Sequence, residues 1–493
     1  MRRFSIVLAP WFAICSACAG AMEPAPYPAD EAAPQATAPA PRAAPTGPVI
    51  EAAPAWIGAA PAQTVIVHNA ADSVWIGIWV ATPEAAPSAA RPPMSLALVV
   101  DTSGSMAGPK IENARLAATS LLEGVASGDV VAIDAFASTV RTIAPPTTIG
   151  PGTLGPLMSA VRGLEAMGGT NLYDGLRLGT AHAGASREHP LRRVIVISDG
   201  QANVGPSTPE ALGALAAQGT EGGVQVSAIG VGIDYDERTL GELARRSSGR
   251  LYHLEEPSQL AGILDQEVRL LSTTVATGAY LEISAGSGVE LQDAAFADAR
   301  RDGGALRVPL GSLYAGQRRE VLVRARVRGT PGSEPTLAKV RLVYEDRAAG
   351  GTWSAQSLAL RGKLSDDPKA AAASSDARVQ AMVARHDAAE AQRSAAEMMN
   401  KGRAQEAAVE LEKAEQRVTA AAKRADDPAE RARLTAQAAR MSQTRDQFMK
   451  AEKKSYARQR SLSLQTYQYS FSDDGLAAPP APPPSPPSAP TKR

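Results

Sequence analysis

Two short runs of this chain are wholly apolar, and each is followed at once by polar residues that include a carboxylate. Residues 96–100 lead into Asp101, and residues 194–197 lead into Ser198 and Asp199. A strand that is buried on both faces of a parallel sheet reads as a continuous apolar run of this kind. Because the sites of open α/β sheets lie just past the carboxyl ends of their strands, these polar residues are predicted to mark a binding site.

The segment after the first run carries oxygen-bearing side chains at alternate positions. In extended backbone the side chains of Asp101, Ser103 and Ser105 point the same way, so one carboxylate and two hydroxyls face a common point. Thr170 adds a hydroxyl on a loop whose two preceding glycines let backbone approach closely. Such hard oxygen donors suit Mg²⁺, Mn²⁺ or Ca²⁺ and suit zinc or copper poorly. The pattern therefore favours a site for a hard divalent cation.

These segments, in this order, resemble the von Willebrand factor A (VWA) domain with a metal-ion-dependent adhesion site. Residues 169–176, 198–205 and 229–232 extend the resemblance over nearly all of 95–270, as in bacterial secreted VWA proteins and the heavy chains of inter-alpha-trypsin inhibitor. The resemblance implies that the two serines and the threonine can bind the metal directly, while the aspartates often act through water. The alternative is a metal-free VWA scaffold in which the polar loops satisfy one another. The implied metal site is Asp101, Ser103, Ser105, Thr170 and Asp199.

The order of patterns along the chain predicts several domains. Alternating strands and helices over 94–271 predict an α/β fold with a doubly wound, mostly parallel, Rossmann-like sheet. Short strands between Gly-rich turns over 273–363 predict an antiparallel β-sandwich, which the strands of 63–84 are expected to join, making the VWA domain an insertion. Residues 372–459, rich in good helix formers, predict a C-terminal helical hairpin or bundle. The Ala/Pro-rich residues 22–62 and the Pro-rich residues 475–493 are predicted to be a linker and a disordered tail.

The first 21 residues have the character of a secretory signal peptide. Two arginines precede an apolar stretch that is shorter than the roughly 20 residues a bilayer-spanning helix needs. Both cysteines lie here, and Cys18 follows residues that resemble a bacterial lipobox, although Cys15 stands where leucine is usual. We therefore expect an exported protein of the periplasm, outer membrane or cell surface, without internal disulfides, whose only membrane attachment is an N-terminal lipid.

Composition and motifs argue against two classes of function. Lysine plus arginine equals aspartate plus glutamate, 51 each, and aromatic residues make up 4%, which argues against a nucleic-acid-binding surface. Ser103 lacks the GxSxG elbow of a hydrolase, and no general base stands beside the site. The histidines show no paired metal-binding spacing and are expected to be structural: His182, His189, His253 and His386. The chain is therefore predicted not to be an enzyme and to have no catalytic residues.

The residues and the resemblance together predict a metal-dependent protein-binding module for adhesion or scaffolding in the cell envelope. Mg²⁺ keeps water in positions that the protein leaves open, and an Asp or Glu carboxylate of a protein partner can displace one water. A helix expected near residues 258–270, between the VWA segment and the sandwich, is the predicted element for transmitting a change at the site. The alternative is a structural envelope protein in which the metal only stabilises loops and the sandwich or helices carry the interactions.

Overall fold

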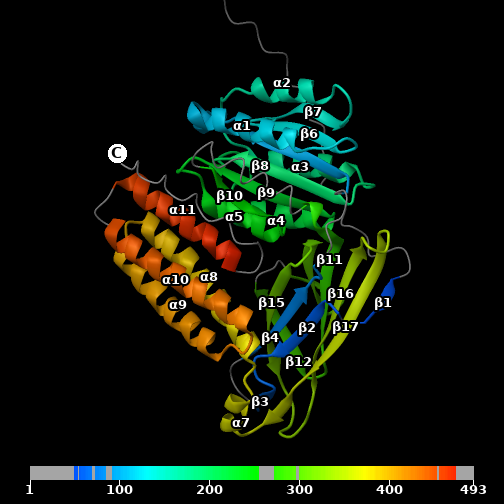
Figure 1. Cartoon of the computed structure of the whole chain (residues 1–493), viewed down its shortest axis with the longest axis vertical. Helices are drawn as coiled ribbons and strands as arrows, with labels where there is room; N and C mark the ends of the chain where they lie inside the picture. The colour runs from blue at the N-terminus through cyan, green and yellow to red at the C-terminus, as the bar shows by residue number, and fades with distance from the viewer. Residues whose placement is uncertain are drawn as a thin grey trace, which may run out of the picture. The chain divides into compact units, whose positions relative to one another are not determined.

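The computed structural model describes residues 49–53, 55–68, 73–84, 92–254, 271–295, 299–451 and 455–473, and Figure 1 shows their elements. The predicted signal peptide, Cys18, most of the predicted linker, the helix near 258–270 and the Pro-rich tail lie outside these residues. None of the described helices combines the length and the apolar character that crossing a bilayer requires.

The first sheet holds six strands, of which five are parallel. Its order is β10-β9-β8-β5-β6-β7, and only the edge strand β7 runs against its neighbour. Every residue of β5, β6, β8 and β9 is buried, as expected for strands covered on both faces. The strands are β5 (Met94–Asp101), β6 (Val130–Phe136), β7 (Val140–Thr148), β8 (Leu191–Ser198), β9 (Val224–Val231) and β10 (Leu251–Leu254).

Helices cover both faces of this sheet, so it is doubly wound as predicted. On one face α1 (Pro109–Glu123) and α2 (Leu154–Arg162) share an apolar core with Leu98. On the other face three helices share a core with Val99, namely α3 (Leu172–Ala185), α4 (Pro209–Glu221) and α5 (Glu237–Arg246). Successive residues of β5 face opposite cores because side chains alternate along a strand. β5 and β8 are parallel neighbours, so their carboxyl ends meet at one edge.

Two further sheets share one apolar core and form the predicted β-sandwich. Their pairings are antiparallel except that of β1 with β17, which is parallel. The predicted linker was wrong for residues 50–52 and 57–61, because pairing with β17 and β4 makes these Ala- and Pro-containing segments strands. One sheet contains β2 (Ile57–Pro61), β4 (Val74–Ala81), β12 (Val289–Ala295) and β15 (Arg318–Val327). The other contains β1 (Ile50–Ala52), β11 (Thr274–Ala285), β13 (Arg300–Asp302), β14 (Ala305–Tyr314), β16 (Thr336–Asp346) and β17 (Thr352–Arg361).

Strand β4 precedes the first sheet in the sequence and pairs with β15, which follows it. In this antiparallel pairing Ile78 lies opposite Val321, and both side chains are buried. A separate two-stranded sheet also joins distant segments, because β3 (Val65–Val67) pairs in parallel with β18 (Lys363–Ser365). The chain therefore enters the sandwich, leaves it to form the first sheet, and returns to it.

Four long helices follow the sandwich in the part of the chain that the structure describes. After the short α7 (Pro368–Ala373) come α8 (Ala377–Asn400), α9 (Ala404–Arg424), α10 (Pro428–Ala451) and α11 (Tyr456–Asp473). The last of these continues past residue 459, where the predicted helical region ended. Its residues include many serines, threonines and tyrosines, which are weak helix formers. Packing stabilises it instead, since Leu464, Tyr467 and Phe471 are buried in the core that contains α5.

Candidate metal site

Asp101 ends β5 and is fully buried. Its Oδ1 accepts the backbone N–H of Ser103 at 2.8 Å, and its Oδ2 accepts the hydroxyl of Ser198 at 2.5 Å. Burial raises the pKa of Asp101 to about 6, the hydrogen bonds from Ser103 and Ser198 oppose this rise, and the charge of Asp199 adds to it. A nearby cation would stabilise this carboxylate, because its charge is removed from water and faces a second acid.

Ser103 and Ser105 bring their hydroxyls together just beyond Asp101. Their Oγ atoms are 3.1 Å apart, and Ser103 is buried whereas Ser105 is exposed. The predicted extended backbone was wrong for Ser105, because Gly104–Met106 form a single 3₁₀ turn. The N–H of Met106 donates to the carbonyl of Ser103 at 3.0 Å and closes this turn. The two hydroxyls still converge, through the turn rather than through strand alternation.

The loop that carries Thr170 is tied by a backbone hydrogen bond to the segment after β5. The N–H of Gly104 donates to the carbonyl of Gly168 at 2.9 Å. Gly168 has a φ of +77°, in the left-handed region that favours glycine. Thr170 is 2% exposed, and its N–H donates to Oδ1 of Asn203 at 2.8 Å. These contacts place the threonine's loop beside the turn that carries Ser105.

Asp199 follows β8 and pairs with a residue that the sequence did not single out. Nζ of Lys110, in the first turn of α1, lies 2.9 Å from Oδ2 of Asp199, whose side chain is fully buried. The main chain of Asp199 is held as well, since its carbonyl accepts the N–H of Asp236 at 2.8 Å. No sequence signal pointed to Lys110, because the contact spans 89 residues and depends on how α1 packs on the sheet.

The predicted ligand residues come from three segments that meet at one edge of the first sheet. Two carboxylates and three hydroxyls make up the donor set, which is the hard oxygen chemistry of Mg²⁺ and similar ions. Across the described ranges, no three His, Cys, Asp or Glu side chains gather into a metal-binding group, and this site has only two carboxylates. The residues present therefore fit a hard divalent cation that is bound by hydroxyls as well as by carboxylates.

Exposed residues surround this edge. Ser105, Gly168 and Gln201 are exposed, and Met167 is 58% exposed. The backbone of Met167 is held in place, because its N–H donates to the carbonyl of Thr102 at 2.7 Å. Flexible, polarisable methionine side chains are common on protein-binding surfaces. The candidate site thus opens to solvent beside an apolar side chain on a fixed backbone.

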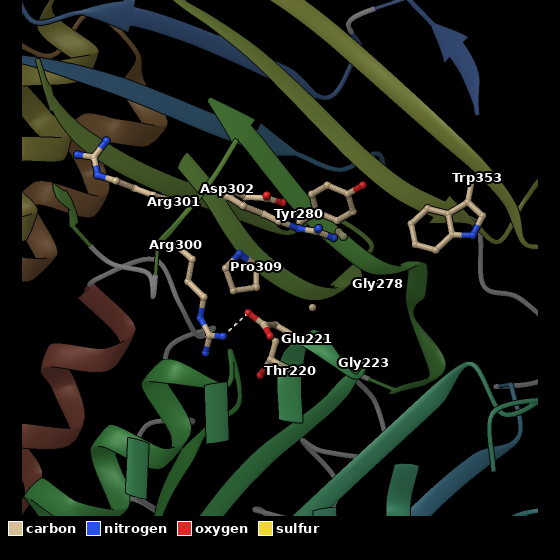
Figure 2. A pocket seen from close by; sticks show the side chains of 13 residues that line it. Thr220, Glu221, Gly223, Gly278, Tyr280, Arg300, Arg301, Asp302, Pro309 and Trp353 are labelled. Atoms are coloured by element: carbon tan, nitrogen blue, oxygen red, sulfur yellow. Dashed lines mark ion pairs between the residues drawn. The ribbon is translucent and has the colours of Figure 1, made fainter. Parts of the chain in front are cut away.

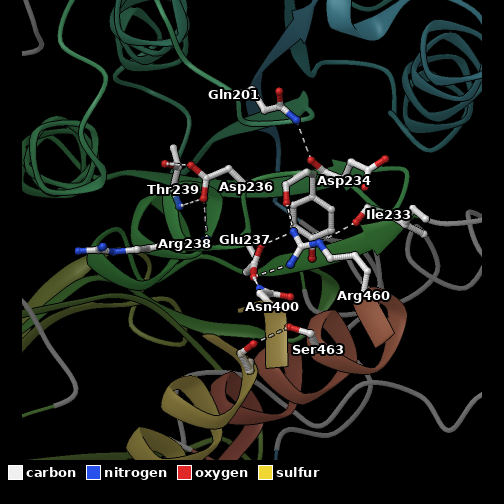
Figure 3. A network of polar contacts seen from close by, with 12 residues as sticks. Gln201, Ile233, Asp234, Asp236, Glu237, Arg238, Thr239, Asn400, Arg460 and Ser463 are labelled. Carbon is white, nitrogen blue, oxygen red and sulfur yellow. Dashed lines mark hydrogen bonds and ion pairs between the residues drawn. The ribbon is translucent and has the colours of Figure 1, made fainter. Parts of the chain in front are cut away.

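The loop between β9 and α5 connects this edge to the C-terminal helices (Figure 3). Nε2 of Gln201 donates to the carbonyl of Asp234 at 2.8 Å. From the other side, Nε of Arg460 in α11 donates to the carbonyl of Ile233 at 3.0 Å, and its guanidinium pairs with Glu237. The same loop therefore contacts both the segment after Asp199 and the helical region.

A separate cavity of about 290 Å³ lies between the end of α4 and the sandwich (Figure 2). Tyr280 and Trp353 line it, and Cζ of Arg307 lies 3.9 Å from the centre of the Tyr280 ring. Beside them Nη1 of Arg300 pairs with Oε1 of Glu221 at 2.5 Å. None of the predicted site residues lines this cavity.

Two of the histidines make polar contacts within the fold. Nδ1 of His182 lies 3.0 Å from Oδ2 of Asp134, which is fully buried in β6. Nε2 of His189 lies 3.0 Å from the carbonyl oxygen of Gly128. These contacts join neighbouring elements of the α/β domain.

Sequence comparison identifies the α/β segment. The family model described as the von Willebrand factor type A domain matches residues 95–266. An uncharacterized protein of Synechocystis sp. is 24% identical over 53% of this chain and 64% of its own length. The inter-alpha-trypsin inhibitor heavy chain H3 of Homo sapiens is 30% identical over 37% of this chain and 22% of its own length. The chain thus matches less than two thirds of either relative.

Two solved structures share the fold at low sequence identity. A von Willebrand factor type A protein from Catenulispora acidiphila has a TM-score of 0.61 and 17% identity, over 81% of this chain and 90% of that one. The ArnB paralog VWA2 from Sulfolobus acidocaldarius has a TM-score of 0.54 and 18% identity, over 85% of this chain and 98% of that one. The likeness extends well past the first sheet. Together with the family match, it shows that this chain contains a von Willebrand factor type A domain at residues 95–266.

Proposed function

We propose that this chain is a non-enzymatic protein-binding module of the cell envelope, whose VWA site takes an acidic side chain of a partner protein through Mg²⁺ or a similar divalent cation. VWA domains commonly mediate protein–protein interaction, often with a metal ion. The residues that would hold the ion are Asp101, Ser103, Ser105, Thr170 and Asp199. The predicted signal peptide and lipobox support export and a lipid anchor at Cys18.

The observation that carries this proposal is the meeting of buried carboxylates and convergent hydroxyls at an exposed edge. Asp101 and Asp199 are both fully buried, and among the described residues Lys110 is the one cation paired with either of them. One negative charge is left to be offset, which a bound cation would do. The Ser103 and Ser105 hydroxyls, 3.1 Å apart, add oxygen donors, and Ser105 is the exposed one of the two.

The exposed side of the site supports a role in binding a partner. A hard divalent ion keeps water where the protein supplies no ligand, and a carboxylate is the anion best suited to replace that water. Ser105 is exposed, so an incoming side chain can reach the site. Met167 would contact an apolar residue next to the partner's acid.

The first experiment measures Mn²⁺ binding to the full chain by electron paramagnetic resonance. We expect one site in the wild type, and affinity weakened by about tenfold or more in Ser105→Ala. Ser287→Ala, in the exposed turn after β11, is the matched control and should bind as the wild type does. Asp101→Ala should abolish binding, and Ser105→Ala covers the case in which loss of the buried aspartate prevents folding. Absence of Mn²⁺ binding by the wild type at millimolar concentration contradicts the proposal.

A second experiment separates adhesion from the structural alternative. Capture of partners from an envelope extract is compared in Mg²⁺ and in chelator, with the wild type and with Ser105→Ala. Capture that requires both Mg²⁺ and Ser105 supports the adhesive function. Metal binding with unchanged capture supports the structural envelope protein, in which the ion only stabilises loops.

A further inference from the structure

Lys110 brings a positively charged ammonium group to the candidate site. Its Nζ lies 2.9 Å from Oδ2 of Asp199, and the side chains are 23% and 0% exposed. Its stem runs along the backbone after β9, because a Cβ added at Gly232 would lie 3.4 Å from its Cε and 3.7 Å from its Cγ. This packing orients the lysine toward Asp199. The ammonium is therefore a built part of the site.

Because of the charges in the site, Lys110 affects the binding of both the metal ion and the partner's carboxylate. Asp101 and Asp199 together carry two negative charges, and Lys110 carries one positive charge. With a divalent cation bound, the group has a net charge of plus one; without the lysine it would be neutral. Before the ion binds, the group carries a net charge of minus one with the lysine and minus two without it, so the lysine lowers the attraction for a divalent cation. After the ion binds, the net positive charge attracts an anion, and both effects are strong where side chains are buried. The lysine thus weakens metal binding and strengthens carboxylate binding.

We propose that Lys110 determines the specificity of this site: its ammonium competes with a divalent cation for Asp199 and gives the loaded site the positive charge that selects an acidic partner. This inference rests on the proposed function. Lys110 lies outside the predicted ligand set. Its charge is expected to weaken binding of the ion and to strengthen binding of the partner's carboxylate.

The first test is Mn²⁺ affinity of the full chain in three variants. Lys110→Met removes the charge, and Lys110→Gln removes the charge but keeps a hydrogen-bond donor for Asp199 in case the apolar variant fails to fold. Both are expected to bind Mn²⁺ at least about tenfold more tightly than the wild type, a difference of about 1.4 kcal/mol. Lys110→Arg keeps the charge and should stay within about threefold of the wild type. Lys339→Met, at an exposed position of β16, is the control and should leave the affinity unchanged.

The second test uses acetate as a minimal carboxylate and follows the relaxation of its protons by Mn²⁺ in the loaded protein. Acetate should bind at least about threefold more weakly to Lys110→Gln than to the wild type. An unchanged Mn²⁺ affinity in the charge-removing variants, or an unchanged acetate affinity, overturns the inference about Lys110. A wild type that binds no Mn²⁺ instead overturns the proposed function, so the two failures are distinguishable.

Discussion

Arg460 of α11 forms an ion pair with Glu237 of α5, in which Nη2 lies 2.5 Å from Oε2 and both side chains are 9% exposed. Arg460 also donates to the carbonyl of Tyr235, and Nδ2 of Asn400 donates to Glu237 at 2.7 Å. The C-terminal helices therefore hold the loop after β9 at its backbone and at its first helical residue. The N–H of Asp236 in this loop donates to the carbonyl of Asp199, so the helices support the candidate metal site indirectly.

Removal of Arg460 should destabilise the protein strongly. Arg460→Met leaves Glu237 buried without its cation, which costs about 3–5 kcal/mol. Urea unfolding measures the loss of free energy. The control is Arg238→Met, which breaks an exposed pair with Glu210 and should cost less than about 1 kcal/mol. Equal effects of the two variants would contradict a stabilising role for the buried pair.

A buried hydrogen bond joins the VWA domain to the sandwich. Nη2 of Arg193 in β8 donates to the Tyr314 hydroxyl in β14 at 2.6 Å, and both residues are buried. Tyr314→Phe removes this acceptor and should lower the free energy of unfolding by about 1–3 kcal/mol. Tyr456→Phe, at a residue that is 65% exposed, should change it by less than about 0.5 kcal/mol. Thermal unfolding of both variants checks the difference, and a neutral Tyr314→Phe would count against this contact.

Close packing of α3 on the first sheet depends on glycine at position 179, which has no side chain. A Cβ added at Gly179 would lie 2.2 Å from Cγ2 of Val99, so Gly179→Ala should destabilise the protein by about 1–3 kcal/mol. The matched control is Gly155→Ala in α2, where no atom lies within 4 Å of an added Cβ. There alanine should raise stability by up to about 1 kcal/mol, because it favours the helix. Chemical denaturation of both variants should give opposite signs; a stabilised Gly179→Ala would show that α3 shifts freely.

Acid should weaken the stabilising contribution of Glu242. Burial raises the pKa of this carboxyl, but hydrogen bonds and charges from Arg245 and Arg246 outweigh burial and hold the pKa below its usual value of 4.5. A depressed pKa stabilises the folded state fully above pH 4.5, and the contribution is lost as pH falls through the folded-state pKa. Glu242→Gln should therefore be less stable than the wild type by about 0.5–1 kcal/mol at pH 7. The gap should narrow as the pH falls below 4.5, and a gap of the same size at pH 7 and in acid would contradict this assignment.

The two aspartates of the candidate site were predictable because they lie at strand ends. β5 and β8 are buried on both faces, which requires apolar residues throughout, so the runs at 96–100 and 194–197 located both strands and the acids that follow them. Ser105 was foreseen as a donor but not in its 3₁₀ turn, because strand periodicity says nothing about where a strand stops. The ligand role of these residues stays a prediction.

The sequence by itself determined the α/β class, the sandwich and most of the helical region, since local propensity and apolar periodicity report which faces must be buried. Only the tertiary structure decided which segments cover those faces. Lys110 meets Asp199 across 89 residues, β4 pairs with β15 across the whole VWA domain, and α11 is helical because it packs on α5 and α8. Such contacts form when elements that are distant in the sequence pack together. A local sequence pattern does not show which distant residue a side chain will contact.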